Sequence, residues 1–353
     1  MTTVFYISFS TLFQSANTVQ VLNMCDSLSR SHKVILFCFK GIGDINIKKY
    51  YNLKGNFEIV FLSKFKLLNL FLIIFKLIIL KTKPIIYTRV YYFAFVFSFL
   101  DYKVYYEKHS VSNSILEKML DVINNSFKNL KTVVISKPLE QYFRNELTYR
   151  ENLIYAPDCG QLNRINFTKL CSYKSKFIVS YIGSLSDGKG LNILLKLVGR
   201  LPKITFIVAG KSSTNLSNLF SSFKNVDFRG EVSYAESLNI LSVSSVGLNP
   251  TQDFTSTALT HPWQSPLKLF DYMSMGCTII SSSLEMYNDI LSTENSLLIY
   301  DPKDITSWVD SINLLESNVN FRNKLARNAF LLHLKYFNWD KRVEFIFNEN
   351  CYP

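Results

Sequence analysis

The chain has 353 residues, of which 48% are hydrophobic, and it carries a formal net charge of +12. This length exceeds what one hydrophobic core usually fills, so we expect two domains. The positive charge indicates an anionic partner, which could be nucleic acid, a phosphorylated ligand or the surface of an acidic membrane. The six cysteines are far apart and form no C-x-x-C pair, which argues against disulfides and structural zinc and favours a cytoplasmic location.

Strand-like segments alternate with helical segments through the first half of the chain. The N-terminal stretch MTTVFYISFSTLF has no lysine or arginine before its apolar run, so it predicts a first strand and not a secretion signal. Runs of β-branched and aromatic residues cover 3–9, 33–39, 57–62, 84–88, 103–107 and 132–136. This alternation is typical of a parallel sheet that helices cover on both faces.

The most apolar segment of the chain is KFKLLNLFLIIFKLIILKTK, residues 64–83. A membrane-spanning helix needs about 20 apolar residues, and Asn69 and Lys76 interrupt this one, so a span is the least favoured interpretation. Two others stay open: a crossover helix packed on the sheet, or a basic helix that also dips into the headgroups of an anionic membrane. The aromatic run at 90–100 is open to the same two interpretations.

The alternation pauses over the polar stretch 152–175 and then resumes. Further strands are predicted at 176–183, 204–210, 225–230, 244–250, 277–282 and 295–300. We therefore expect an α/β protein with Rossmann-like domains at 1–165 and 176–337, and a terminal helix in 338–353 that could pack back on the first domain. Such folds bind ligands at the carboxyl ends of their strands, so we expect a cleft between two facing domains.

The stretch SPLKLFDYMSMG, residues 265–276, predicts a helix over 266–275. Ser265 suits the N-cap, Pro266 the first helical position and Gly276 the left-handed residue that ends the helix. The helix N-terminus offers free N–H groups to an anion. Lys268 and Asp271 share one helix face, which suits a nucleotide if the lysine meets diphosphate and the carboxylate meets ribose. Lysine–aspartate pairs at this spacing are also common on helix surfaces without any ligand.

A second glycine-rich turn lies about 80 residues earlier, in YIGSLSDGKGLNILLKL. A strand ends at Gly183, the chain turns through Ser184, and a helix follows Lys189 and Gly190. Glycines allow the backbone to approach a ligand closely, and the lysine would lie beside it. Each turn alone is a weak signal, but two such turns in one domain are moderately specific for a phosphate-bearing ligand.

Together these segments resemble the GT-B glycosyltransferases of the retaining group called family 4. The resemblance implies that Gly183, Ser184, Lys189 and Gly190 bind the donor diphosphate. It also implies that SPLKLFDYMSMG carries further donor-binding residues, namely Ser265, Pro266, Leu267, Lys268 and Asp271. Lys189 and Lys268 would then act in catalysis by stabilising the departing diphosphate.

The first half of the chain also fits this resemblance. Asn17 stands in a small-residue loop before a helix, Arg89 ends the segment YTR, and Glu107 and His109 lie in YYEKHS. The resemblance implies that these four residues lie on the acceptor side and that His109 acts in catalysis. From the residues alone, His109 is equally well explained as a hydrogen-bonded structural histidine.

Three positions depart from the family pattern. Ser184 stands where a basic residue is frequent, Asp271 replaces a longer glutamate, and Trp263 stands where a second acidic residue is expected. We expect His261, Gln264 or Asp253 to contact the sugar in its place. These departures keep a second hypothesis open: a catalytically degenerate GT-B protein that acts as a partner subunit.

The resemblance implies sugar transfer from a nucleotide-diphosphate sugar, with retention, to a saccharide or lipid-linked acceptor in bacterial surface polysaccharide synthesis. The chain contains no D-x-D sequence, so we expect a metal-independent enzyme without a cofactor. We expect it at the cytoplasmic face of the inner membrane, held by an anionic lipid surface. A dinucleotide-binding fingerprint and a basic stripe with interleaved aromatic residues are both missing, which argues against an oxidoreductase and a nucleic-acid-binding protein.

Overall fold

The computed structural model describes residues 1–12, 15–41, 46–80, 82–149, 151–212, 216–252 and 263–349. The chain forms two compact units: unit 1 is Met1–Pro157 with Trp339–Pro353, and unit 2 is Asp158–Asn338. The chain thus enters unit 2 at Asp158, before residue 165, where the sequence predicts the end of the first domain. The physical reason is that this stretch packs within unit 2, where the Asn163 amide donates to the Ser274 carbonyl at 3.0 Å.

Unit 1 contains a parallel seven-stranded sheet in the order β3-β2-β1-β4-β5-β6-β7. Its strands are β1 (Thr3–Thr11), β2 (Lys33–Phe39), β3 (Glu58–Leu62), β4 (Ile85–Thr88), β5 (Val104–Lys108), β6 (Leu130–Val134) and β7 (Leu153–Tyr155). The six predicted strands are confirmed, and β7 is an edge strand hidden in the polar stretch. Central strands such as β1 are buried along nearly their whole length because helices cover both faces.

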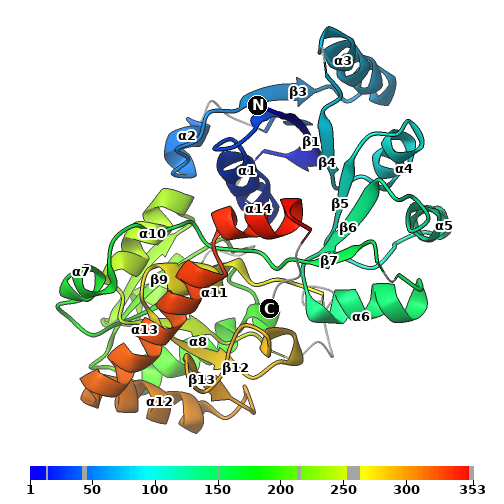
Figure 1. Ribbon diagram of the computed structural model, residues 1–353. Coiled ribbons are helices and arrows are strands. Elements are labelled where there is room, and N and C mark those ends of the chain that lie inside the picture. Colours follow the sequence, from blue (N-terminus) through cyan, green and yellow to red (C-terminus); the bar gives the residue numbers. More distant parts are fainter. Residues whose placement is uncertain are drawn as a thin grey trace. The chain divides into compact units, whose positions relative to one another are not determined.

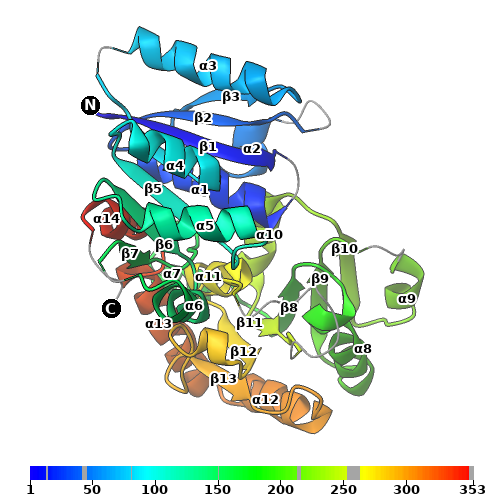
Figure 2. The same ribbon diagram turned by 90° about the vertical axis from the view of Figure 1, so that its right-hand side faces the viewer.

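The strand order determines which face each helix of unit 1 covers. The helices are α1 (Ala16–Leu28), α2 (Ile47–Tyr50), α3 (Lys66–Ile79), α4 (Tyr91–Phe99), α5 (Ile115–Asn124), α6 (Lys137–Glu146) and α14 (Trp339–Phe347). The sheet grows one way from β1 to β3 and the other way from β4 to β7. Right-handed crossovers therefore place α1 and α2 on one face and α3 to α6 on the other, as Figures 1 and 2 show.

Unit 2 contains a parallel six-stranded sheet in the order β10-β9-β8-β11-β12-β13. Its strands are β8 (Ile178–Ile182), β9 (Thr205–Ala209), β10 (Val226–Gly230), β11 (Val246–Asn249), β12 (Thr278–Ser282) and β13 (Ser296–Ile299). Its α-helices are α7 (Phe167–Ser172), α8 (Leu191–Arg200), α9 (Ser217–Ser221), α10 (Tyr234–Val243), α11 (Leu267–Ser274), α12 (Ile305–Ser317) and α13 (Val319–Lys335), with 3-10 turns η1 (Asp187–Lys189) and η2 (Glu285–Tyr287). The predicted α/β class with two parallel sheets is confirmed.

The two apolar segments that invite a membrane interpretation are helices of unit 1, and both pack on its sheet. Ile73 of α3 and Phe93 and Phe97 of α4 lie in the core. Within the described residues, no helix has both the length and the apolar character that crossing a membrane requires. Each helix nevertheless leaves large apolar side chains exposed on its other side.

Candidate functional site

The strand order reverses between β8 and β11 in unit 2, and the predicted donor-side residues gather at the carboxyl ends of these strands. Ligands of open α/β sheets usually bind at such a reversal. Gly183 follows β8 with φ +146°, and Gly190 precedes α8 with φ +88°. A Cβ at Gly190 would lie 2.1 Å from the Pro250 carbonyl oxygen, so no larger residue fits there. The turn 183–190 is therefore held closely against the end of β11.

Tyr181 connects this turn to α11. Its hydroxyl donates to the Ser184 carbonyl at 2.6 Å and lies 3.3 Å from the Lys189 carbonyl. The Lys268 Nζ lies 3.4 Å from the same hydroxyl and 4.5 Å from the centre of the Tyr181 ring. The tyrosine thus places Lys268 beside the turn, and a side chain at Gly183 would begin only 3.4 Å from its Nζ.

Lys189 of this turn and Lys268 of α11 share one electrostatic property: burial lowers the pKa of both. Burial, together with the positive charge of the neighbouring Lys189, lowers the pKa of Lys268 to about 7. Burial also lowers the pKa of Lys189, whose Nζ donates to the Gln264 Oε1 at 2.7 Å. Among the residues that the structure describes, no carboxylate forms an ion pair with either lysine. An anion bound here would neutralise two desolvated cations.

The N-terminus of α11 differs from the sequence-based prediction. The helix begins at Leu267, and its N-cap is Pro266, which offers no side-chain hydrogen bond. Ser265 does not cap it because its Oγ accepts a hydrogen bond from the Asp158 N–H at 3.0 Å. The predicted end is confirmed, since Gly276 has φ +62° just after the helix. The first turn of α11 is therefore left without a side-chain cap.

Asp271 lies one turn beyond Lys268 and is 8% exposed. Its Oδ1 accepts a hydrogen bond from the Tyr234 hydroxyl of α10 at 2.6 Å. Burial raises the pKa of Asp271 to about 7, although the bond from Tyr234 opposes this shift. Of the residues expected to replace the missing acidic group, Asp253 and His261 lie outside the described residues.

In unit 1 the predicted acceptor-side residues form one cluster at the reversal between β1 and β4. The Glu107 Oε1 lies 2.5 Å from the His109 Nε2 and 3.6 Å from the Arg89 Nε. Arg89 also donates to the side chains of Asn17 and Gln20. The structure thus brings together four residues that are scattered over the first third of the chain.

Arg342 of α14 completes this cluster, although nothing in its local sequence distinguishes it from an exposed arginine. Its Nη1 lies 3.0 Å from the Glu107 Oε2, and it donates to the carbonyls of Pro157 and Ala156 at 2.8 and 3.1 Å. Tyr87 donates to the same carboxylate oxygen. Burial alone would raise the pKa of Glu107, but Arg342 and His109 outweigh it and hold that pKa well below its usual range.

His109 is neutral near pH 7 in this environment. Burial and the positive charge of Arg89 lower its pKa to about 4, against the opposing effect of Glu107. Because the Glu107 carboxylate accepts from Nε2, the neutral ring carries its proton there and keeps an acceptor lone pair on Nδ1. This side chain is 23% exposed, so Nδ1 is the candidate acceptor for a substrate hydroxyl.

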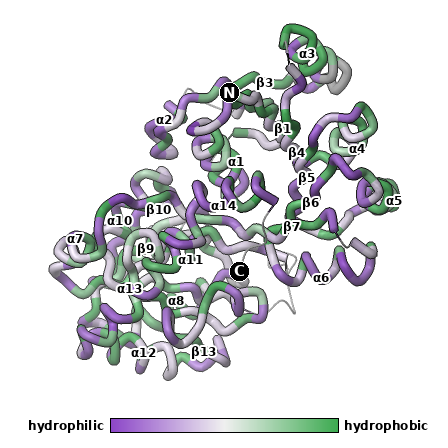
Figure 3. The backbone as a smooth tube through the Cα atoms, in the orientation of Figure 1, coloured by the Kyte–Doolittle hydropathy of each residue, from purple (hydrophilic) through white to green (hydrophobic). Residues whose placement is uncertain are grey.

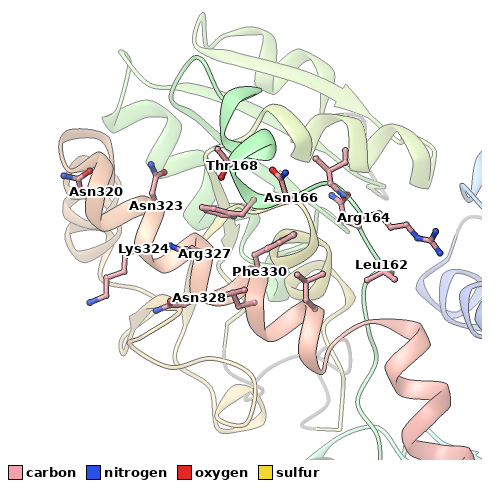
Figure 4. A pocket seen from close by; sticks show the side chains of 15 residues that line it. Leu162, Arg164, Asn166, Thr168, Asn320, Asn323, Lys324, Arg327, Asn328 and Phe330 are labelled. Carbon is pink, nitrogen blue, oxygen red and sulfur yellow. The ribbon is translucent and has the colours of Figure 1, made fainter.

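A separate open groove of about 1000 Å³ lies in unit 2 between the 162–168 segment and α13. Figure 4 shows Arg164, Lys324 and Arg327 among the polar side chains that line it. None of the predicted donor-side residues belongs to this groove. Within the described ranges, no group of three or more histidine, cysteine, aspartate or glutamate residues is arranged to hold a metal ion.

Comparison with known proteins finds sequences and structures that are similar to this chain. Residues 191–348 match a family model described as glycosyl transferase-like. Sucrose-phosphate synthase from Thermosynechococcus elongatus is 15% identical with a TM-score of 0.70, covering 99% of this chain and 98% of that one. HepE of Anabaena in complex with UDP is 13% identical with a TM-score of 0.70, covering 99% of both chains.

A third similar structure is WaaG, a glycosyltransferase involved in lipopolysaccharide biosynthesis. It is 11% identical with a TM-score of 0.62, covering 97% of this chain and 98% of that one. No curated protein sequence matches the chain significantly. The likeness along nearly the whole length shows that the chain has the GT-B fold, as the motifs in the sequence imply.

Proposed function

We propose that this protein is a glycosyltransferase that uses a nucleotide-diphosphate sugar as its donor. The observation that carries the proposal is the pair Lys189 and Lys268, two desolvated cations at the β8/β11 reversal without a carboxylate partner among the described residues. The glycosyl transferase-like match over 191–348 and the UDP and UDP-glucose bound by HepE support it.

The proposed roles follow from the chemistry of each group. As the bond from the sugar to the diphosphate breaks, negative charge develops on the departing oxygen, and preorganised cations stabilise it. Lys189, Lys268 and the uncapped start of α11 would supply that stabilisation. Asp271 would accept hydrogen bonds from the ribose hydroxyls. Gly183, Ser184 and Gly190 would let the backbone approach the diphosphate.

On the acceptor side, we assign His109 Nδ1 to the acceptor hydroxyl, with Glu107, Arg89 and Asn17 holding the ring and its surroundings. Attack on the face that the diphosphate leaves would retain the anomeric configuration. We propose a metal-independent reaction, because the two lysines would carry the charge that a bridging cation carries in metal-dependent sites. Addition of EDTA should then leave turnover unchanged, whereas a requirement for Mg²⁺ would contradict this part.

The acceptor that we propose is a lipid-linked saccharide of bacterial surface polysaccharide synthesis, met at the cytoplasmic face of the inner membrane. The apolar side chains that α3 and α4 leave exposed in unit 1 support a membrane-bound acceptor.

Calorimetric titration with UDP, GDP, CDP and ADP in metal-free buffer tests the donor site. We expect one nucleotide to bind selectively and its binding to be lost in Asp271→Ala. Asp310→Ala, which removes an exposed aspartate from α12, is the matched control and should bind as the native protein does.

The second hypothesis, a degenerate partner subunit, is favoured by Ser184 and Trp263, which stand where charged residues are expected. It predicts that none of the four nucleotides binds to the native protein.

A further inference from the structure

Helix α5 turns its apolar face to the solvent and buries polar side chains against the sheet. Five of its six apolar residues, Ile115, Leu116, Met119, Val122 and Ile123, are exposed, from 41% for Ile123 to 83% for Ile115, and Leu120 is half-buried. Its polar residues Asp121 and Asn124 are completely buried. A helix on the surface of a water-soluble domain normally turns its apolar stripe towards the core. The reversed orientation of α5 therefore raises two questions: which buried group holds its polar face against the sheet, and what covers its exposed apolar face.

The cause on the inside is Lys108, the last residue of β5. It is buried, and its Nζ lies 2.7 Å from the Glu117 Oε1 and 2.9 Å from the Asp121 Oδ2. The Ser112 hydroxyl donates to the same Asp121 oxygen at 2.6 Å. Turning α5 over would remove both carboxylates from this buried cation, so these two pairs hold the polar face of α5 against the sheet.

The exposed face of α5 continues over the two preceding helices. Right-handed crossovers place α3, α4 and α5 on one face of the sheet, and Figure 2 shows them following one another there. The hydropathy colouring in Figure 3 marks apolar residues along all three. Besides those of α5, the large exposed apolar residues of this face are Phe65, Leu68, Phe71, Ile74, Phe75, Ile78, Ile79, Val96, Phe99 and Leu100.

We propose that this face, formed by α3, α4 and α5, seats unit 1 on an anionic lipid bilayer, with α5 lying in the interface. The charges around the face match anionic headgroups. Lys64, Lys118 and Lys128 are exposed on or beside these helices, while both carboxylate-bearing residues of α5 are turned inward to Lys108. The face consists of projecting side chains on successive helices, which suits immersion among acyl chains.

This inference deepens the proposed function, because it names the surface through which a lipid-linked acceptor would be approached. It does not depend on nucleotide binding, because the residues proposed for the donor site all belong to unit 2. Failure of the two can therefore be told apart on the same samples: loss of vesicle binding counts against this inference, and absence of nucleotide binding counts against the proposed donor site.

Co-sedimentation with vesicles of phosphatidylcholine, with and without phosphatidylglycerol, tests the inference. The decisive variant is Ile115→Gln, Met119→Gln and Val122→Gln, which alters only exposed side chains and leaves Lys108 and its partners intact. We expect vesicle affinity to fall about tenfold or more, with the affinity for nucleotide and the melting temperature unchanged. Leu219→Gln, Leu314→Gln and Val319→Gln, three exposed apolar positions of unit 2, form the matched control and should bind vesicles normally.

A further variant measures how much the exposed lysines contribute to vesicle binding. Lys118→Gln with Lys128→Gln should weaken binding to vesicles that contain phosphatidylglycerol and leave binding to pure phosphatidylcholine unchanged. Equal binding of the α5 variant and the native protein would overturn the proposal. The proposal would also be overturned if the native protein did not bind vesicles but formed dimers, and if the α5 variant did not form them. A second copy of the chain would then be the partner.

Discussion

The charged clusters of the two units differ in how their charges are balanced. In unit 1, Glu107 is only 3% exposed, yet Arg342 and His109 hold its pKa well below its usual range. In unit 2, Lys189 and Lys268 lie beside each other, and burial lowers the pKa of Lys268 to about 7. The first cluster is complete within the protein. The second has an excess of positive charge that no described carboxylate neutralises.

This difference separates residues that stabilise the folded protein from residues whose charge only a bound ligand would neutralise. A buried charge whose partners are all supplied by the fold contributes to a defined geometry, and removing one partner is costly. A buried cation without a partner costs stability in the free protein, and an anionic ligand relieves that cost. We therefore expect substitutions in unit 1 to act mainly on stability and substitutions in unit 2 mainly on binding.

The largest effect is expected for Arg342→Met. The substitution leaves the Glu107 carboxylate buried without its closest cation, and we expect the free energy of unfolding to fall by about 3 to 5 kcal/mol in urea titrations. Lys341→Met, which breaks an exposed pair on the same helix, is the control and should cost about 0.5 kcal/mol or less.

A double variant sharpens this test. Adding Glu107→Gln to Arg342→Met removes the unpaired charge, so part of the lost stability should return. If Arg342→Met unfolds at the same urea concentration as Lys341→Met, the cluster of unit 1 is not the balanced network that we describe.

The second effect concerns Lys268→Met, which keeps the aliphatic stem beside Tyr181 and removes the charge. We expect the affinity for the selected nucleotide diphosphate to fall about 100-fold, because a preorganised cation at the diphosphate is lost. The melting temperature should stay the same or rise slightly. Lys203→Met removes an exposed lysine of unit 2 and should change neither quantity; a similar loss in both variants would show that only net charge matters.

Asp271→Asn is expected to increase the free energy of unfolding at high pH. The folded state raises the pKa of Asp271 above its unfolded value, so the penalty for its ionised form appears as pH rises from about 4 and is complete above about 7. At pH 8 the variant should be more stable than the native protein by about 1 to 3 kcal/mol, and the difference should vanish near pH 4. Thermal unfolding at both pH values measures it, and a variant less stable at pH 8 would contradict the assignment.

The smallest effect is the pH dependence of nucleotide binding. A bound diphosphate favours the protonated form of Lys268, whose pKa in the free protein is about 7, so binding takes up protons above that pH. Between about pH 7 and 9 the affinity should fall by at most about tenfold per pH unit. Calorimetry in buffers of different ionisation enthalpy measures the proton uptake.

His109 should contribute no pH dependence to nucleotide binding in this range because its pKa is about 4. Lys268→Met should lose this slope, and a slope that persists would assign it to another group.

The sequence predicts the regular parts of this fold well. Short runs such as 33–39 and 277–282 could only be buried strands, and the glycines at 183, 190 and 276 mark turns whose backbone excludes other residues. The sequence predicts the start of α11 incorrectly because Ser265 is a good N-cap by residue type, whereas its hydrogen-bond partner in the structure, Asp158, lies far away in the chain. Local signals locate elements and turns, but they do not show which distant group competes for a side chain.

The same limit explains the two features that the sequence analysis missed. Arg342 lies in an amphipathic terminal segment, where an arginine is ordinarily solvent-exposed, and only the fold brings it to Glu107. The periodicity of α5 predicts an apolar face towards the core, because nothing in its own sequence reveals that Lys108 draws its carboxylates inward. In both cases a buried charge from another element decides the outcome.

The division of the chain also bears on the order in which the protein is completed during synthesis. Unit 2 is one continuous piece, and Gly160 pairs with Asn338 where it begins and ends. Unit 1 is interrupted: its sheet is translated first, but Glu107 receives Arg342 only when α14 leaves the ribosome. Until then the Glu107 carboxylate lacks its closest cation and, among the described residues, has only Arg89 nearby. We therefore expect the later-translated unit to reach its native state first, and the earlier one to depend on the last helix for its final stability.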